Sequence, residues 1–440
     1  MEFDSIDTRI ITLGEARIPS PVNSEEKLSK DYFISDDERV LIDVNAAKLR
    51  NLLAEGKEIP SFETAGPRSK IYFDPSKVRC ALVTCGGLCP GLNDIIRAIV
   101  LELYYRYGVR NIYGIRYGLR GFIPKYGYDV EKLMPTAVSG ILDMGGSILG
   151  SSRGEQNIDE IVDCLERMNI GILFMIGGDG TLMAAKKIAD TILDRKIKIS
   201  VVGIPKTIDN DIYMVARSFG FDTAVDVATQ SIKGAHNEAE SYPNGIGLIK
   251  LMGRHSGFIA TTAALAQQEV NYVLIPEVDF DLEGPRALLA KLEKRLKDRN
   301  HAVIVVAEGA GQKFFEAAGD ELDASGNIRL KDIGLYLKTK ITEYFQARNI
   351  DISLKYIDPS YMIRSLPANA NDSVFCGFLG RDAVHAGMAG KTKLIVGHWN
   401  NHFVHIPIDT SAGKRKQVDP NGKLWQTVLD STGQGSLTNE

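Results

Sequence analysis

The sequence predicts an α/β fold with two doubly wound domains whose sheets are mostly parallel. Short apolar runs rich in β-branched residues alternate along the chain with longer helical patterns. These runs form two successive sets, and most read as near-continuous apolar stretches, as expected when both faces of a parallel sheet are covered. Ligands of such sheets bind beyond the carboxyl ends of the strands, so the residues that follow each strand are the candidates for chemistry.

The expected elements lie between two polar segments of the chain. Residues 1–75 predict an extension wrapped on the surface, and residues 410–440 predict a surface tail that is partly loose. The first set has expected strands at 78–84, 170–176 and 199–203, with helices at 93–106 and 181–193. The second set has expected strands at 246–251, 272–275, 302–307 and 352–357, with helices at 256–267, 283–297 and 332–347.

Composition and charge exclude several classes of protein. Apolar residues make up 44% and charged residues 25% of the 440 residues, which is ordinary globular usage. A net charge of −4 without a basic tract gives no electrostatic case for nucleic acid, and no apolar run predicts a membrane span. The acidic start of the chain does not read as a secretory signal. Five cysteines without a disulfide framework indicate a reducing compartment, so a cytoplasmic protein is expected.

Two glycine-rich loops are candidates for binding phosphate. Gly86 and Gly87, in the stretch TCGGLCPG, follow the first expected strand and precede a helix, so their N–H groups could bind an anion. A tight turn that needs a positive φ explains them equally well. Further on, the stretch GSSRG places Arg153 in a second loop, where a guanidinium suits bidentate phosphate contact. An ordinary surface arginine is the alternative.

Carboxylates follow the next two expected strands. Asp179, in GGDGT, could hold Mg²⁺ together with substrate phosphates, or it could be an ordinary turn aspartate. In PKTIDND, Thr207, Asp209 and Asp211 alternate and therefore share one face of an extended segment. A carboxylate beside a metal-bound phosphate can accept the proton of an attacking hydroxyl. The alternative is a surface ion pair of these carboxylates with Lys206.

Basic groups also follow strands of the second set. Arg254 ends the stretch KLMGR and Arg364 ends YMIR, so a substrate with phosphate at more than one place is expected. His255 is interpreted as structural or peripheral.

In this order, the stretches TCGGLCPG, GSSRG, GGDGT, PKTIDND, KLMGR and YMIR resemble the motifs of the phosphofructokinase family, across residues 78–400. The resemblance implies two Rossmann-like domains with the active site in the cleft between them. It implies transfer of a phosphoryl group to the 1-hydroxyl of fructose 6-phosphate, a step of glycolysis, with ATP as donor and Mg²⁺ as cofactor. It also implies a homo-oligomer, either a dimer or a tetramer.

The resemblance further implies a role for each matching residue. The implied catalytic residues are Asp209 as general base, Thr207 as a transition-state contact, Asp211 as a supporting carboxylate, and Lys206 and Arg153 as cations at the transferred group. The implied ATP-binding residues are Gly86, Arg153, Gly154, Gly178, Asp179, Gly180 and Thr181, with Asp179 as the magnesium ligand. The implied substrate-binding residues are Thr207, Asp209, Met252, Gly253, Arg254, Glu277, Lys355, Tyr361 and Arg364. The implied domains are an extension at 1–75, a phosphoryl-donor domain at 76–220 plus 365–410, and a sugar-phosphate domain at 221–364 plus 411–440.

Two positions bear on the identity of the donor. Pyrophosphate-dependent members of the family also carry lysine at the position of Lys206, but they have aspartate where Gly180 stands. Glycine with lysine resembles the ATP-dependent branch found in plants, trypanosomatids and some bacteria. An aspartate at position 180 would crowd and repel the α-phosphate of a nucleotide, whereas glycine leaves room. ATP is therefore the expected donor, and pyrophosphate is the alternative.

Two further classes of protein were weighed against a kinase. A Rossmann oxidoreductase would need GxGxxG with an acidic residue about 20 positions further on, and neither follows the strand at 78–84. A non-catalytic sugar-phosphate sensor would need neither the metal ligand Asp179 nor the base Asp209.

Overall fold

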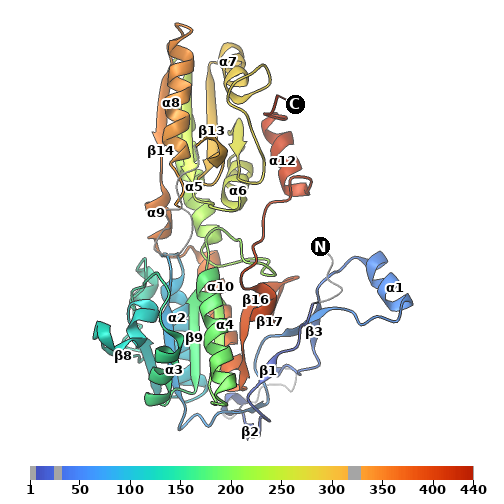
Figure 1. The fold of residues 1–440 in the computed structure, drawn as a ribbon, viewed down its shortest axis with the longest axis vertical. Coiled ribbons are helices and arrows are strands. Elements are labelled where there is room, and N and C mark those ends of the chain that lie inside the picture. The colour runs from blue at the N-terminus through green and yellow to red at the C-terminus, as the bar shows by residue number, and fades with distance from the viewer. Residues whose placement is uncertain (1–5, 24–31, 316–328, 440) are drawn as a thin grey trace. The chain divides into compact units, whose positions relative to one another are not determined.

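The computed structural model describes residues 6–23, 32–315 and 329–439, and the chain divides into two compact units (Figure 1). Unit 1 comprises Met1–Thr207, Ile212–Gly220 and Ser365–Lys414. Unit 2 comprises Ile208–Asp211, Phe221–Arg364 and Arg415–Glu440. Residues 1–5 and 24–31 of the predicted extension, and residue 440 of the predicted tail, lie outside the described residues.

Unit 1 is built on a nine-stranded sheet whose five central strands, β16, β10, β9, β6 and β7, are parallel. Antiparallel strands continue the sheet at both edges. In spatial order the strands are β3 (Arg39–Leu41), β4 (Ser61–Thr64), β17 (His402–Pro407), β16 (Leu394–Trp399), β10 (Ser200–Pro205), β9 (Ile172–Gly177), β6 (Arg79–Thr84), β7 (Asn111–Ile115) and β8 (Val130–Lys132).

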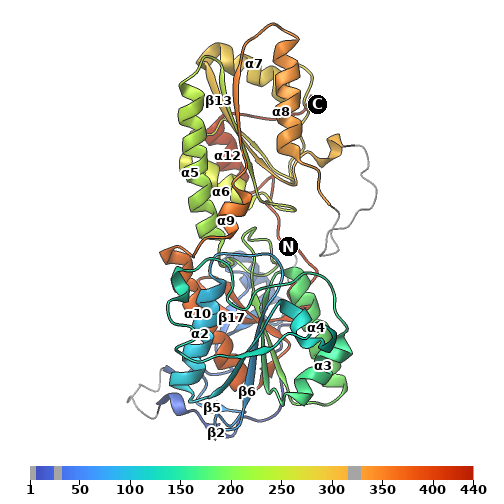
Figure 2. The same ribbon diagram turned by 90° about the vertical axis from the view of Figure 1, so that its left-hand side faces the viewer.

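Helices cover both faces of this sheet (Figure 2). Side chains alternate along β9, so that Leu173 and Met175 join the core beneath α3 and α4, while Ile172 and Phe174 lie against Gly387 of α10 on the opposite face. Every residue of β9 is buried, as the continuous apolar stretch predicts. Among the helices of unit 1, α2 (Leu92–Leu101) and α10 (Ala370–Met388) pack on one face of the sheet, and α3 (Ile158–Arg167) and α4 (Asp179–Asp194) pack on the other. A π-helical turn, η3 (Glu102–Arg106), continues α2.

Unit 2 contains a four-stranded sheet in which every strand is parallel to its neighbour. In spatial order its strands are β12 (Tyr272–Leu274), β13 (His301–Ala307), β11 (Gly245–Leu251) and β14 (Ser353–Ile357). Helices again cover both faces: α7 (Leu288–Arg299) and α8 (Ile333–Gln346) pack on one, and α5 (Phe221–Glu240) and α6 (Phe258–Gln267) pack on the other. The sequence pattern did not predict α5 or α10.

The segment predicted as an extension contributes strands to unit 1. In addition to β3 and β4 in the large sheet, β1 (Ile11–Thr12) pairs with β15 (Lys391–Thr392), and β2 (Ile18–Pro19) pairs with β5 (Lys70–Ile71). The helix α1 (Ala46–Ala54) buries none of its residues, and Asn45 caps its first turn.

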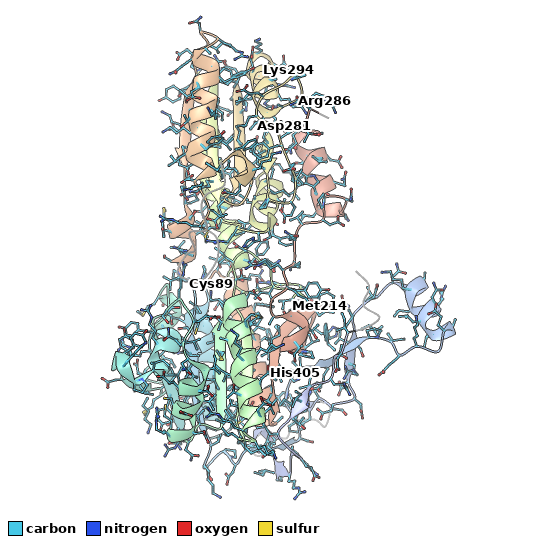
Figure 3. All side chains as sticks on the ribbon, in the orientation of Figure 1. Cys89, Met214, Asp281, Arg286, Lys294 and His405 are labelled. Atoms are coloured by element: carbon cyan, nitrogen blue, oxygen red, sulfur yellow. The ribbon has the colours of Figure 1, made fainter. Side chains whose placement is uncertain are left out.

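A buried ionic network fixes this segment to the sheet of unit 1. His405 of β17, which is labelled in Figure 3, places its Nδ1 atom 2.8 Å from an Oε1 atom of Glu63 on β4. Lys391 and Arg68 both lie 2.8 Å from the same carboxylate oxygen, and both also pair with Asp36. Burial alone would raise the pKa of Glu63, but hydrogen bonding to His405 and the charge of Lys391 lower it to about 2.

The prediction of a partly loose tail at 410–440 is wrong. Residues Lys423–Thr432 form α12, in which Trp425 and Val428 are buried. The side-chain amide of Gln434 makes two hydrogen bonds with the backbone of Val273, at 2.7 Å and 3.2 Å. These bonds pair the free edge of the edge strand β12. Leu437 packs into the core of unit 2. The buried residues of this segment are separated by polar ones, and this spacing concealed the helix. Within the described part of the chain, no helix combines the length and the apolar character that a membrane span requires.

Candidate active site

The residues predicted to bind the phosphoryl donor gather in unit 1, beyond the carboxyl ends of three neighbouring strands. In the sheet register Thr84 of β6 lies opposite Ile176 of β9, and Pro205 of β10 lies opposite Gly177, so these strands end at the same edge. The residues brought to this edge are Gly86, Arg153, Gly154, Gly178, Asp179, Gly180, Thr181, Lys206 and Thr207.

Two of the predicted loops are held against each other at this edge. The N–H of Gly86 donates to the carbonyl of Ser152 at 3.1 Å, and the hydroxyl of Ser151 donates to the carbonyl of Gly86 at 2.6 Å. Gly86 has a φ of +85°, so the tight-turn explanation for this glycine holds. Close approach holds as well, because a Cβ atom on Gly86 would lie 3.8 Å from the Nζ of Lys206, and one on Gly87 would lie 3.3 Å from an Nη2 of Arg153. Two cationic groups therefore face a glycine backbone here.

Lys206 and Thr207 belong to the stretch PKTIDND, in which a catalytic carboxylate was predicted. The backbone N–H of Lys206 donates to the carbonyl of Gly177 at 2.9 Å, which continues the pairing of β10 with β9 for one residue beyond the strand. Lys206 is buried, and its ammonium faces the loop that contains Gly86. The hydroxyl of Ser218 donates to the carbonyl of Thr207 at 2.7 Å. Because Lys206 is buried, the alternative of an ion pair at the surface is wrong about the position of this residue.

Asp179 begins helix α4, with Gly178 as its N-cap. The positive end of the helix dipole stabilises a negative charge at this position. The Oδ1 of Asp179 also accepts a hydrogen bond from the N–H of Gly413 at 2.8 Å. No heavy atom lies within 4 Å of the place where a Cβ on Gly180 would be, so the exposed face of this turn is open.

The donor set around Asp179 fits Mg²⁺. A single carboxylate supplies the hard oxygen ligand that Mg²⁺ prefers, and this ion usually completes its shell with waters and substrate phosphates. Across the described residues, no three side chains of His, Cys, Asp or Glu gather as a protein-only metal site. A metal at Asp179 would need further ligands, and phosphate oxygens are among those that Mg²⁺ accepts.

Asp209 and Asp211 belong to unit 2, where they lie among groups from other strand ends. A backbone N–H of Arg254, just after β11, donates to the carboxylate of Asp209. The hydroxyl of Ser256 donates to the carbonyl of Asp209 at 3.1 Å. The carboxylate of Asp211 lies 3.2 Å from the guanidinium of Arg415.

The surroundings of Asp209 strongly disfavour its charge. Burial raises the pKa of Asp209 to about 8, and the negative charges of Asp211 and Glu308 add to the shift. The N–H of Arg254 and the charge of Arg415 oppose it. A carboxyl group with a pKa near the operating pH is suited to take up and release a proton.

The loop after β11 places Met252, Gly253 and Arg254 beside the carboxylates of unit 2. Gly253 has a φ of +129°, and a Cβ atom there would lie 2.5 Å from the carbonyl oxygen of Ser256, so only glycine fits. The N–H of Glu308 donates to the carbonyl of Leu251 at 2.9 Å, which continues the pairing of β13 with β11 for one residue beyond β13.

Glu277 follows β12 and is fixed by two backbone donors. Its Oε1 accepts from the N–H of Gly257 at 2.9 Å and from the N–H of Val418 at 2.8 Å. Its Oε2 is buried and has no hydrogen-bond partner among the described residues. Burial raises the pKa of this carboxyl group. Glu277 therefore offers one unsatisfied acceptor to a ligand that donates hydrogen bonds, such as a sugar hydroxyl.

Tyr361 and Arg364 lie on the short helix α9 (Ser360–Arg364), which follows β14. The guanidinium of Arg364 lies 4.6 Å from the centroid of the Tyr361 ring, which is 74% exposed. Lys355 is not brought to this edge. It is the middle residue of the edge strand β14, where it pairs with Gly247 of β11. Its ammonium lies 5.2 Å from the ring of Tyr242, which precedes β11.

Three charged residues at this site were not predicted from the sequence. Glu308 follows the apolar run of β13 directly, so the rule that selected the other strand ends could have found it. Arg415 and Lys416 were interpreted as part of a surface tail that is partly loose. The structure instead places Arg415 on Asp211, and burial lowers the pKa of Lys416 to about 8 although Asp211 opposes that shift.

A comparison with known proteins identifies a matching family profile and several proteins of similar sequence. The profile of the family described as Phosphofructokinase matches residues 79–387. The chain is 50% identical over 438 residues to the ATP-dependent 6-phosphofructokinase of Borreliella burgdorferi, which covers 98% of this chain and 97% of that protein. It is 46% identical over 436 residues to the enzyme of the same name from Amycolatopsis methanolica, with 97% and 95% covered. It is 45% identical over 423 residues to ATP-dependent 6-phosphofructokinase 7 of Arabidopsis thaliana, with 95% and 85% covered.

Solved structures resemble the fold. A pyrophosphate-dependent phosphofructokinase from Marinobacter aquaeolei matches with a TM-score of 0.66 at 19% identity, over 81% of this chain and 91% of that chain. A phosphofructokinase from Pichia pastoris in the T-state matches with a TM-score of 0.63 at 21% identity, over 82% of this chain and 37% of that one. At this level of identity the likeness bears on the fold alone, and it confirms the predicted α/β class.

The raised pKa of Asp209 predicts a pH-dependent gain in stability for Asp209→Asn. An unfolded aspartate ionises near pH ~4, whereas the folded group keeps its proton up to a pKa of about 8. The wild-type protein therefore loses this contribution to stability as the pH rises between these values. The variant should gain on the wild type over that window, by about 2–4 °C in Tm for each kcal/mol.

Thermal unfolding of both proteins across the pH range measures this difference. Asp430→Asn, which removes an exposed carboxylate from α12 of the same unit, is the matched control. A difference between Asp209→Asn and the wild type that does not change with pH would contradict the raised pKa.

Proposed function

The chain belongs to the phosphofructokinase family, and we propose that it transfers the γ-phosphoryl group of ATP to the 1-hydroxyl of fructose 6-phosphate, giving fructose 1,6-bisphosphate. The observation that carries this proposal is the near full-length identity of 50% and 46% to two proteins named ATP-dependent 6-phosphofructokinase. The positions at which the donor and the acceptor would be recognised support it.

The donor-binding group in unit 1 supplies positive charge where the phosphoryl group transfers. We assign the polyphosphate of ATP to the backbone N–H groups around Gly86 and Gly178, with Arg153 and Lys206 beside it. Asp179 would hold Mg²⁺, which neutralises charge on the phosphate oxygens when it is bound. The buried position of Lys206 supports this role, because a cation removed from water acts strongly on developing charge.

The acceptor-binding group in unit 2 supplies the base and the sugar contacts. Asp209 takes the proton from the 1-hydroxyl, the oxygen forms a bond to the γ-phosphorus, and the bond from that phosphorus to the bridging oxygen of ADP breaks. Arg254 and Arg364 are assigned to the 6-phosphate, together with Tyr361. Glu277, with its unsatisfied Oε2, is assigned to a sugar hydroxyl. The remaining predicted contacts, Met252 and Gly253, shape the same loop.

Lys355 is left out of the proposed site. Its mid-strand position and its contact with Tyr242 place it away from the strand ends that hold Arg254.

The reaction requires both groups of residues to contact one pair of substrates. Thr207 of the donor-binding group and Asp209 of the acceptor-binding group are two residues apart in the chain. Covalent geometry therefore keeps their Cα atoms within about 7 Å, whatever arrangement the two units adopt. This short connection supports the assignment of the two groups to a single site.

The choice of ATP over pyrophosphate rests on Gly180. The space beyond this residue is open, which leaves room for the α-phosphate and the nucleoside of ATP. An aspartate at this position would place a negative charge in that space. Lys206 serves the transferred phosphoryl group with either donor and does not select between them.

We also propose a cellular compartment and an oligomeric state for this protein. All five cysteines lie in the described part of the chain and are free thiols, which supports a cytoplasmic enzyme. Val374 and Phe378 of α10 are 62% and 49% exposed, and such apolar side chains on a helix surface support a homo-oligomer. Sedimentation equilibrium should give the mass of a dimer or a tetramer. A monomer at all concentrations would contradict this assignment.

The role of Asp209 as the base predicts a large loss of turnover in Asp209→Ser. Removal of a general base typically lowers the rate by about 10²–10⁴-fold. Because the variant keeps the sugar-phosphate contacts, the dissociation constant for fructose 6-phosphate should change little. Steady-state kinetics together with calorimetric titration of the sugar phosphate measure both quantities. Wild-type turnover in this variant would remove Asp209 from the proposed role.

The role of Gly180 predicts that Gly180→Asp impairs the use of ATP. The added carboxylate should raise the KM for ATP and lower kcat/KM with ATP by about 10-fold or more, since like charges at this range repel. Coupled assays on fructose 6-phosphate with ATP and with pyrophosphate measure the change for each donor. Gly127→Asp, at an exposed turn of unit 1, serves as the control for adding an aspartate. Unimpaired ATP kinetics in Gly180→Asp would refute the steric argument, and higher wild-type turnover with pyrophosphate than with ATP would reverse the assignment of the donor.

A further inference from the structure

Arg415 lies about two hundred residues beyond Asp211 in the sequence, yet it contacts the proposed catalytic segment. Its Nη1 atom is 3.2 Å from an Oδ2 of Asp211, and the adjacent N–H, that of Lys416, donates to the carbonyl of Asp211 at 2.7 Å. One side-chain contact and one backbone contact thus fix the same aspartate. The side chain of Asp211 is 10% exposed and that of Arg415 is 33% exposed, so solvent screens this ion pair less than it screens a fully exposed one.

The three consecutive basic residues of this segment have different surroundings. The ammonium of Lys414 lies 5.5 Å from the ring of Tyr213, and that of Lys416 lies 5.1 Å from the ring of Phe258. The guanidinium of Arg415 is the group that meets a carboxylate of the proposed site. An arginine suits this place because its charge persists at every relevant pH and its fork matches a carboxylate.

Charged and titratable groups face Asp209 from four segments of unit 2. Asp211 comes from its own segment, Arg254 from the loop after β11, Glu308 from the end of β13, and Arg415 from the C-terminal segment. His255 and Lys416, from the same loop and the same C-terminal segment, interact by charge with Asp211. Asp211 and Glu308 oppose a negative charge on Asp209, whereas Arg254 and Arg415 favour it. Of the two cations, Arg254 is assigned to the sugar phosphate, and its charge will be shared with that ligand.

We propose that Arg415 is a positioning residue, which holds the side chain of Asp211 and offsets its charge so that Asp209 can ionise and act as the base. This inference rests on the proposed function, because it assigns Asp209 the role of base. Arg415 does not contact the reacting atoms in this proposal. It acts through Asp211 and through the electrostatic potential at Asp209.

The direction of the effect follows from charge. Without Arg415, the negative charge of Asp211 is offset less, and ionisation of Asp209 becomes harder. The acid limb of the profile of kcat/KM against pH, which reports the base in the free enzyme, should move to higher pH. A direct opposite charge shifts a carboxyl group by about 1–3 units, and Arg415 acts on Asp209 from one residue further away. The expected displacement is therefore about 0.5–1 pH unit.

The first experiment compares Arg415→Gln with the wild type in kcat/KM for fructose 6-phosphate at saturating ATP, from about pH 6 to about pH 10. Below the acid limb, the variant should be about 3–10-fold slower, which is the displacement of 0.5–1 unit expressed as ionised fraction. Above the limb, the two profiles should converge. Arg415→Lys should recover most of the displacement because it retains the charge, and Lys414→Gln, which removes a charge one residue away, should leave the limb in place.

A second experiment measures thermal stability and does not depend on enzyme activity. The difference in Tm between Arg415→Gln and the wild type should grow as the pH rises, because the wild type ionises Asp209 more readily. In the Asp209→Asn background the same substitution should lose that growth with pH, since the titrating group is absent. This double-mutant cycle tests the coupling of Arg415 to Asp209 even if the enzyme used another substrate.

The outcomes separate the inference from the proposed function. An acid limb that stays in place, with an equal loss at every pH, would overturn the positioning role. A raised KM for either substrate above the limb would also overturn it, because Arg415 would then bind substrate directly. A wild-type enzyme inactive on fructose 6-phosphate with ATP would refute the proposed function, and the stability cycle would still decide whether Arg415 controls Asp209.

Discussion

The burial of Asp209 beside two other carboxyl groups is the constraint on which the chemistry of unit 2 depends. Burial opposes its charge, and the negative charges of Asp211 and Glu308 oppose it further, so its pKa rises to about 8. Such a group is unfavourable for stability and persists only where the surroundings hold it. Three segments fix these carboxyl groups in place: the loop after β11, the loop after β13 and the C-terminal segment. Each of them is hydrogen-bonded to a neighbouring strand or to the aspartate segment itself.

The surroundings of the Asp179 carboxylate in unit 1 differ from those of the Asp209 carboxylate in unit 2. Asp179 sits in the first turn of α4, where the helix dipole favours negative charge, and it accepts a hydrogen bond from Gly413. The aspartate of unit 1 therefore lies beside a helix N-terminus and a backbone donor, whereas the aspartate of unit 2 is buried beside two carboxyl groups. The different roles proposed for Asp179 and Asp209 depend on these different surroundings.

The core of the fold could be predicted because its strands carry their own signal. β9 and β10 are buried along their whole length and read as apolar runs. The helix α5 escaped prediction because much of its buried face is alanine, including Ala224, Ala228 and Ala235, which gives a weak apolar periodicity. The strands of the N-terminal segment escaped because they are two to four residues long, below the length at which alternation can be recognised.

The site shows where local sequence stops being informative. Residues such as Asp179, Lys206 and Arg254 could be predicted because the end of a parallel strand marks a ligand-binding edge, and that end is visible in the sequence. Their partners could not, because an ion pair such as that of Arg415 with Asp211 joins segments with no relation in sequence. The position of a residue at the carboxyl end of a strand therefore identifies it as a candidate for the site. The pKa of that residue depends on residues from other strands that end at the same edge. A segment interpreted as a loose tail can for this reason supply a residue that contacts the proposed catalytic segment.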